Sequence, residues 1–335
     1  MEIRRVQMTG GSSYVITLPK EWIKSVNIKK NDQLGLTIQT DGTLLITPTM
    51  VEKQIKNEKI FNVNERIDEK YLLRQLIGAY ISGYDSIKIR SKERIPSKIT
   101  GIIRNFTQIT IGQEVVEETD TSIVIKDLLN PTEMPFTSTL KRMHLVVKSM
   151  HEDVNNSLKT GNKKIAEEVI QRDNDVDRLH WLVARQHNII MQNIGFAEKM
   201  GITIELANTS FLISRIIERI GDHVIRIAQN TINILDKIID EKLLEKLQSA
   251  SDNAINLFDM SITSFLRKDV KSANETIEIV TKLESKCKEL NKILLKQKGD
   301  YVISIGYIID SIRRIGDYSS DISENVINYL TGEEK

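Results

Sequence analysis

The chain has 335 residues and a mass of 38.3 kDa, about twice the size of a typical domain, so we expect more than one hydrophobic core. Its 47 Lys and Arg residues nearly balance its 46 Asp and Glu residues, so the total charge does not indicate a nucleic-acid or membrane partner. With 40% hydrophobic residues, 5 Pro and 16 Gly, the composition excludes collagen, a mucin-like stalk and a long disordered chain.

The first fifty residues alternate between polar and apolar side chains, which is typical of β-strands. Three features mark the connections: Gly10-Gly11, Pro19 ahead of a short helix over 20–25, and Asp41-Gly42 at a hairpin turn. A chain of this length with one thin sheet buries too little apolar surface to be stable alone. We therefore predict a small β domain over 1–50 that shares strands with a second copy.

Helical and strand periods alternate over 51–132. The spacing of apolar residues predicts helices over 72–80 and 99–106, a strand over 86–90 and a hairpin over 114–126. The region has no phosphate loop, dinucleotide fingerprint, nucleophile elbow or histidine-rich metal motif. We interpret it as a small α/β domain that connects or dimerises.

Long apolar stripes at helical spacing begin after Pro135, and a break at Thr160-Gly161-Asn162 ends the first of them. Short turns then separate further helices of similar length. Six long helices joined in this way predict an antiparallel bundle. The predicted helices run from Pro135 to Thr160 and over 163–193, 205–236, 241–268, 269–298 and 301–330.

The bundle contains an internal repeat. Residues 217–233 (IERIGDHVIRIAQNTIN) align without a gap on residues 312–328 (IRRIGDYSSDISENVIN), 95 positions later. That distance equals three helices with their turns, so we predict two tandem three-helix units, over 133–236 and 237–335.

A glycine occupies the same position in each copy, Gly221 and Gly316. Within a helix, glycine costs about 1 kcal/mol relative to alanine. We therefore expect another helix to approach closely at both positions.

The sequence ERIGDH, followed by an apolar helix and preceded by a helix with RDNDVD, resembles the PhoU family, whose members carry two three-helix repeats. The stretch RRVQMTGGSSYVITLPKEWIKSVNIKKND resembles the AbrB/SpoVT family of swapped-hairpin DNA-binding domains. Together they resemble archaeal phosphate-uptake regulators that fuse the two modules. The resemblance implies a multidomain fold: a swapped-hairpin β domain, a small α/β middle domain and an all-α bundle of two PhoU-like repeats.

Two pairs of carboxylates have the spacing that places side chains on one face of a helix: Asp173 with Asp177, and Glu218 with Asp222. Oxygen-rich clusters of this kind suit iron, manganese, zinc or magnesium. Because PhoU proteins carry multinuclear metal sites on such spacings, the resemblance implies a divalent or iron-type metal in the first repeat.

The alternative interpretation of these carboxylates is a solvated salt-bridge ladder. Arg215 lies three residues before Glu218, and Arg226 lies four residues after Asp222, so the helix has the charges to neutralise itself. The sequence leaves both interpretations open.

The second repeat departs from the acidic pattern. Arg313 stands where the first copy has Glu218, and the remaining acidic candidates are Glu284, Asp317 and Asp321. A metal site is therefore weaker here, because an arginine in an acidic cluster takes the place of the cation.

Histidines and the single cysteine add no clear chemistry. His180, His187 and His223 lie near the acidic faces, but an isolated helical histidine is more often a surface or core residue than a ligand. Cys287 cannot form an internal disulfide or a cysteine-based zinc site, which favours a cytoplasmic location. No apolar run is long enough to span a membrane, and the N-terminus lacks a signal-peptide core.

Residues 1–50 carry six cations and four carboxylates, an ordinary excess that by itself does not predict DNA binding. The AbrB/SpoVT resemblance implies it, with cations on phosphates and hydroxyl groups that fix the register. The candidate DNA-binding residues are Arg4, Arg5, Ser12, Ser13, Lys20 and Lys24.

The leading hypothesis is a non-enzymatic regulator of transcription in phosphate uptake and homeostasis, a homodimer or larger assembly that binds promoter DNA. The bundle would be its sensor or docking surface. The alternative is a signalling adaptor that docks a phosphate transporter or a histidine kinase, with the β domain serving only as a dimerisation clamp. A metal-dependent hydrolase is disfavoured because no activated nucleophile or open histidine cluster is present.

Overall fold

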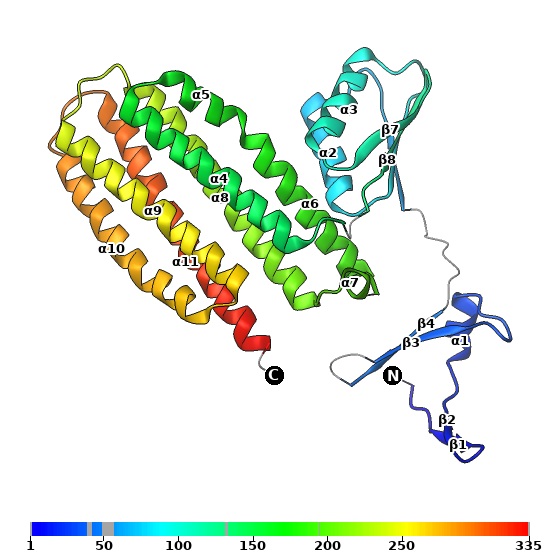
Figure 1. Ribbon diagram of the computed structural model, residues 1–335. Helices are drawn as coiled ribbons and strands as arrows, with labels where there is room; N and C mark the ends of the chain where they lie inside the picture. The colour runs from blue at the N-terminus through cyan, green and yellow to red at the C-terminus, as the bar shows by residue number, and fades with distance from the viewer. Residues whose placement is uncertain (1, 39–41, 49–56, 131–132, 194, 334–335) are drawn as a thin grey trace. The chain divides into compact units, whose positions relative to one another are not determined.

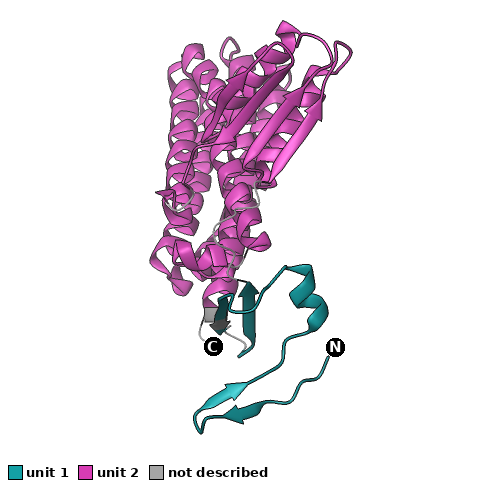
Figure 2. Cartoon of the chain, turned by 90° about the vertical axis from the view of Figure 1, so that its right-hand side faces the viewer, with its two compact units in different colours: residues 1–56 teal, residues 57–335 magenta. Residues whose placement is uncertain are grey.

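The computed structural model describes residues 2–38, 42–48, 57–130, 133–193 and 195–333 (Figure 1). The chain divides into two compact units, Met1–Lys56 and Asn57–Lys335 (Figure 2). The first unit is the small β region that the alternating pattern predicts. The second contains both the α/β region and the long helices, so these two regions fold against each other.

The N-terminal unit consists of two separate antiparallel strand pairs and one short helix. Gly10 and Gly11 form the turn between β1 and β2 with φ angles of 65° and 83°, a conformation that favours glycine. The second pair runs in register from Leu34 opposite Pro48 to Ile38 opposite Leu44. Of the predicted hairpin turn, Asp41 lies outside the described residues. The elements are β1 (Gln7–Thr9), β2 (Ser13–Val15), α1 (Lys20–Ser25), β3 (Leu34–Ile38) and β4 (Leu44–Pro48).

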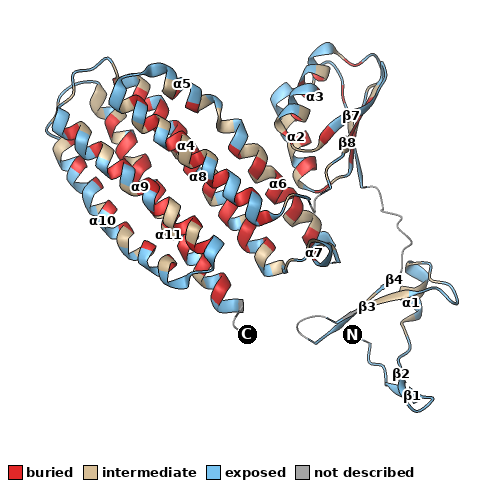
Figure 3. Cartoon of the chain, viewed as in Figure 1, coloured by how far each residue is buried: buried red, intermediate tan, exposed pale blue. Residues whose placement is uncertain are grey.

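No side chain that the structure describes in this N-terminal unit is buried (Figure 3). Large apolar side chains are open to solvent instead: Ile3 is 85% exposed, Ile38 80% and Tyr14 76%. A folded domain normally removes such side chains from water, because each contributes about 1.5–3 kcal/mol when buried. In its described residues, one copy of this unit therefore has strands but no hydrophobic core.

The α/β region is a four-stranded sheet in the order β5-β6-β8-β7, with β5 parallel to β6 and the other pairs antiparallel. Buried side chains of β6 and β8, such as Ile87 and Ile125, share one cluster with Leu76 of α2 and Phe106 of α3, so both helices cover the same face. The elements are β5 (Glu58–Asn62), α2 (Glu69–Ile81), β6 (Ser86–Arg90), α3 (Ser97–Ile109), β7 (Gln113–Glu118) and β8 (Ser122–Asp127).

The predicted helices, strand and hairpin of this region are confirmed, but strand β5 was not predicted. Its two apolar residues, Ile60 and Phe61, are adjacent and do not alternate with polar ones. The strand is held by parallel pairing to β6, from Glu58 opposite Ser86 to Asn62 opposite Arg90. Such pairing between distant segments leaves no local pattern in the sequence.

The helical bundle contains the predicted long helices, with one break (Figure 1). The first ends at Gly161, whose φ of 72° stops the helix as predicted. The helix expected over 163–193 is interrupted at Arg172, whose side chain donates hydrogen bonds to Ser149 and Asp153 on α4. The helices are α4 (Phe136–Thr160), α5 (Lys163–Gln171), α6 (Asp173–Gln192), α7 (Gly195–Met200), α8 (Ile204–Ile234), α9 (Glu241–Arg267), α10 (Val270–Leu294) and α11 (Tyr301–Glu333).

One hydrophobic cluster runs through both repeats of the bundle. Isoleucines at matching positions of α8 and α11, such as Ile220 and Ile315, are fully buried in it. The repeats therefore share a core and do not form two separate ones. In the described part of the chain, no helix combines the length and the apolar character that a membrane span requires.

Helix α6 holds the α/β region through a buried arginine. The Arg185 guanidinium donates to the Asp127 carboxylate at 2.8 Å and to the backbone carbonyls of Tyr80 at 2.6 Å and Tyr84 at 2.9 Å. Burial raises the pKa of Asp127, and the arginine offsets part of that rise. A buried charge pair of this kind cannot lose one partner without a large energetic cost.

Two further side chains of α6 complete this contact. Asn188 donates to the carbonyl of Ile81 at 2.8 Å, and Gln192 donates to the carbonyl of Ser82 at 3.0 Å. The last carbonyls of a helix have no partner within it, so side chains from α6 satisfy the C-terminal end of α2. We name Arg185, Asn188 and Gln192 the α6 clamp; the sequence did not predict it.

Close packing at the repeated glycine is confirmed in only one of the two copies. A Cβ atom added to Gly316 would lie 2.6 Å from the Leu283 side chain, which is too short for any real contact. At Gly221 an added Cβ would lie 3.6 Å from Val147 and Val176, an ordinary van der Waals distance. An alanine at Gly316 therefore forces the Leu283 side chain to move, whereas there is room for a methyl group at Gly221.

We expect the same substitution to have opposite effects at these two positions. Gly221→Ala should raise the free energy of unfolding by up to about 1 kcal/mol, because alanine favours the helix and fits the space. Gly316→Ala should lower it by about 1–2 kcal/mol, because Leu283 must move within a packed core. Urea unfolding of both variants checks this, and equal shifts in the two would contradict it.

Candidate metal centre and candidate nucleic-acid interface

Helices α6 and α8 bring the two predicted carboxylate pairs to one place in the first repeat. Burial is the main cause that raises the pKa of Asp177 to about 6, and the negative charges of Asp173 and Asp222 add to it. Burial is also the main cause that raises the pKa of Glu218 to about 7, followed by the negative charges of Asp222 and Asp177. The pKa values of Asp173 and Asp222 are also raised, mainly by burial. We call Asp173, Asp177, Glu218 and Asp222 the acidic cluster.

The salt-bridge ladder that the sequence left open is not present among the described residues. Within these ranges, no member of the acidic cluster forms a hydrogen bond or an ion pair with a side chain. The Arg226 guanidinium lies 4.8 Å from the centre of the Tyr307 ring on α11. Burial lowers the pKa of His180, and the positive charge of Arg215 lowers it further. The charge of Arg219 offsets part of the repulsion at Glu218.

The donor chemistry of the acidic cluster suits a hard cation, because unneutralised carboxylate oxygens are the ligands that such ions prefer. As the side chains lie, no three Asp, Glu, His or Cys residues in the described ranges are close enough to coordinate one ion. A bound cation would therefore have to draw the carboxylates of α6 and α8 closer together.

In the second repeat an arginine neutralises the corresponding position. Arg313 donates to Asp317 at 2.7 Å and to Asp310 at 3.1 Å. Burial raises the pKa of Asp317, and the two arginines beside it, Arg313 and Arg314, offset this. Glu284 pairs with Lys288 at 3.7 Å. These contacts place a protein cation where a metal would have to bind.

The three histidines near the acidic faces have contacts of their own. His180 lies 3.0 Å from the Ser214 hydroxyl, and His187 lies 2.7 Å from the Asn208 side-chain oxygen. Both rings stack on Phe211. His223 faces Tyr318 on α11. Their contacts give them structural roles and do not direct them into the acidic cluster.

The candidate DNA-binding residues of the N-terminal unit are all exposed. Two precede β1, two lie in or beside the β1–β2 turn and two lie on α1. Arg4 is paired with Glu2 at 2.5 Å, and the other three charged candidates have no ion pair in the described residues. They are Arg4, Arg5, Ser12, Ser13, Lys20 and Lys24.

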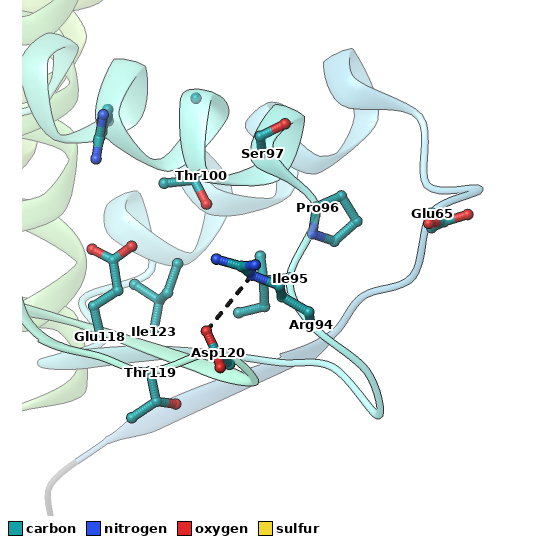
Figure 4. Close-up of a pocket in the computed structure, with 12 residues that line it drawn as sticks. Glu65, Arg94, Ile95, Pro96, Ser97, Thr100, Glu118, Thr119, Asp120 and Ile123 are labelled. Carbon is teal, nitrogen blue, oxygen red and sulfur yellow. Dashed lines mark ion pairs between the residues drawn. The ribbon is translucent and has the colours of Figure 1, made fainter.

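A cavity of about 650 Å³ lies in the α/β region, between the start of α3 and the turn from β7 to β8 (Figure 4). Its lining mixes charges of both signs, with Arg94 and Asp120 3.7 Å apart. Ser97 and Thr100 are among the lining residues, which include no histidine or cysteine.

Comparison with known proteins finds two families along the chain. The profile described as "PhoU domain" matches residues 140–231 and 247–326. The profile described as "Antidote-toxin recognition MazE, bacterial antitoxin" matches residues 7–54. The two PhoU matches coincide with the two repeats of the bundle.

Curated proteins similar to this chain include a phosphate-specific transport system accessory protein PhoU homolog from Thermotoga maritima, which is 22% identical over 58% of this chain and 86% of its own length. A homolog from Xylella fastidiosa is 24% identical over 51% of this chain and 73% of its own length.

Solved structures show the same bundle fold. The structure of PhoU from Pseudomonas aeruginosa matches 60% of this chain and 98% of its own, with a TM-score of 0.55 and 18% sequence identity. The PhoU structure from Streptococcus pneumoniae matches 59% of this chain and 94% of its own, with a TM-score of 0.51 and 16% identity.

Replacing Glu218 by Gln should stabilise the chain at pH 8 in the presence of a chelator. The pKa of Glu218 rises from 4.5 in the unfolded chain to about 7 in the folded chain, so the folded state binds more protons across that range. Stability from this group is therefore lost as the pH rises through the range. Because Glu218 is only partly buried, we expect Glu218→Gln to raise the free energy of unfolding by on the order of 1 kcal/mol at pH 8.

The measurement is the free energy of unfolding between pH 4.5 and pH 8. Glu245→Gln, at an exposed position on α9, is the matched control and should follow the wild type. Parallel pH curves for Glu218→Gln and the wild type would show that the acidic cluster is not coupled in this way.

Proposed function

The chain belongs to the PhoU family, and from this premise we propose that it is a dimeric, non-enzymatic DNA-binding regulator of phosphate uptake. The N-terminal unit would bind promoter DNA, and the helical bundle would act as the sensor or docking surface. Support for the phosphate context comes from relatives named as accessory proteins of phosphate-specific transport systems.

The observation that carries the proposal is the missing core in the described residues of the N-terminal unit. Its strands display Ile3, Tyr14 and Ile38 to solvent, and its two strand pairs are not joined into one sheet. A second copy that adds its strands to these pairs would cover the exposed side chains and supply the missing core. The similarity of residues 7–54 to an antitoxin domain supports the same arrangement.

Dimerisation would also concentrate positive charge. Each copy contributes an excess of two cations over residues 1–50, and the candidate DNA-binding residues are exposed. Two copies related by a two-fold axis present these cations as a symmetric pair, which suits binding to DNA phosphates on both sides of a two-fold site.

We also propose that the acidic cluster binds a divalent or iron-type cation. Support comes from four carboxylates on adjacent helices that form no ion pair in the described residues and whose repulsion Arg219 offsets only in part. A bound cation supplies positive charge that removes the repulsion between α6 and α8. Asp173, Asp177, Glu218 and Asp222 would hold it.

A second candidate function is a signalling adaptor, favoured by the transport-system names of the relatives. In that case the bundle docks a phosphate transporter or a histidine kinase, and the N-terminal unit only dimerises. Capture of such a partner by the purified chain, together with no affinity for DNA, would support the adaptor.

The cation proposal predicts metal-dependent stabilisation. After treatment with chelator, added Mn²⁺ should raise the melting temperature of the wild type, because only the folded chain presents the carboxylates together. Glu218→Ala with Asp222→Ala should abolish the rise. The matched control, Glu284→Gln with Asp321→Asn, changes two carboxylates of the second repeat and should keep the rise. No stabilisation of the wild type by Mn²⁺, Fe²⁺, Zn²⁺ or Mg²⁺ would remove the proposal.

The DNA proposal predicts salt-dependent binding to promoter fragments in a mobility-shift titration. Arg4→Ala with Arg5→Ala should weaken binding and reduce the slope of log affinity against log salt by about 0.9 for each phosphate that the variant no longer neutralises. Lys282→Ala with Lys286→Ala, which removes two exposed cations of α10, is the matched control. If neither the chain's own promoter nor phosphate-transporter promoters are shifted at moderate salt, the regulator proposal is wrong.

A further inference from the structure

A second cavity, of about 300 Å³, lies where the α/β region meets the helical bundle. Arg142 on α4 and Arg178 on α6 line it, together with Asp175. The apolar part of the lining comes from both regions: Ile111 between α3 and β7, Met134 ahead of α4, Val146 on α4 and Leu179 on α6. We call this cavity the junction pocket.

The two arginines of the junction pocket have no partner among the residues that the structure describes. Neither Arg142 nor Arg178 forms a hydrogen bond or an ion pair there, and the Nε atom of Arg178 is shielded from solvent without an acceptor. Elsewhere in the same unit, Arg172, Arg185 and Arg313 each bind a carboxylate. Arg142 and Arg178 therefore carry charges that no ion pair in the described residues balances, and an anionic group in this cavity would supply the missing counter-charge.

We propose that the junction pocket binds a small organic oxyanion, a molecule that carries a phosphate or carboxylate group on an apolar body. Two guanidinium groups against the single carboxylate of Asp175 leave one net positive charge, which suits such a group. The volume lies at the lower end of the range for small-molecule sites and exceeds that of a bare inorganic anion. The apolar body contacts Ile111, Met134, Val146 and Leu179.

The position of this pocket gives its ligand a structural effect. Ile111 is tied to the α/β region, because the Tyr80 hydroxyl donates to its carbonyl at 3.0 Å. Arg178 lies two turns before Arg185, the central residue of the α6 clamp. A ligand in the pocket therefore contacts both regions and stabilises their packing. The site is independent of the proposed DNA binding.

Fluorescence titration of the full-length chain tests the proposal. The chain has two tryptophans, so Trp22→Phe leaves Trp181, one turn after Arg178, as the reporter. The probes are phenyl phosphate, benzoate and inorganic phosphate, with phenol as the neutral control, all in the presence of a chelator. We expect saturable binding of phenyl phosphate or benzoate at least tenfold tighter than that of inorganic phosphate or phenol. The better of the two identifies the natural head group as phosphate or carboxylate.

Variants locate the site. Arg142→Gln with Arg178→Gln should weaken binding at least tenfold, and Asp175→Asn should strengthen it about threefold by removing a negative charge. Arg104→Gln removes an arginine from the other cavity of the α/β region and should leave the affinity unchanged. Circular dichroism checks the fold of each variant, and Asp175→Asn decides the outcome if the double variant does not fold.

Three results would overturn the proposal. The first is the absence of saturable binding by phenyl phosphate and by benzoate. The second is an equal loss of affinity in Arg104→Gln, which would place the ligand elsewhere. The third is weaker binding in Asp175→Asn, which would show that the charge of the pocket does not attract the anion.

Discussion

The buried Arg185 guanidinium is the interaction on which the arrangement of residues 57–335 depends. It binds the carbonyl of Tyr80 in the last turn of α2, the carbonyl of Tyr84 in the loop after α2 and the Asp127 carboxylate at once. Because the side chains of Arg185 and Asp127 are almost completely shielded from water, moving the α/β region away would leave a buried charge without its partner. The α/β region is therefore an extension of the bundle and not an independent domain on a linker. This explains why both regions belong to one compact unit.

Helix α6 connects three features that would otherwise be separate. Its first half carries both the acidic residues Asp173 and Asp177 and the residues of α6 that line the junction pocket, and its second half forms the α6 clamp. The helix also begins at a break, Arg172, whose guanidinium binds Ser149 and Asp153 on α4. A change in charge at the acidic cluster therefore acts on the same rigid element that holds the α/β region.

The parts of the fold that the sequence predicted are those with strong local periodicity. The long helices and the repeat followed from apolar stripes, and the carboxylate pairs followed from their spacing. The α6 clamp was not predictable, because Arg185 and Gln192 look like ordinary polar helix residues and their partners are backbone carbonyls. The absence of an ion pair between Asp222 and Arg226 was also not predictable, since Arg226 has the right spacing for a salt bridge but packs on Tyr307 of the other repeat. Tertiary packing determines which of its possible partners each of these side chains contacts.

If a second copy supplies the core that the described residues of the N-terminal unit lack, as proposed above, the folding of this unit depends on the concentration of the chain. A domain with its own core folds to the same extent at any dilution, whereas a unit that obtains its core from a second copy folds only as far as it associates. The bundle, with a core spanning both repeats, has no such requirement. At low copy number, the chain would therefore keep a folded bundle while its N-terminal unit lost structure. The number of chains in the cell would then set the level of activity of one end of the molecule and not of the other.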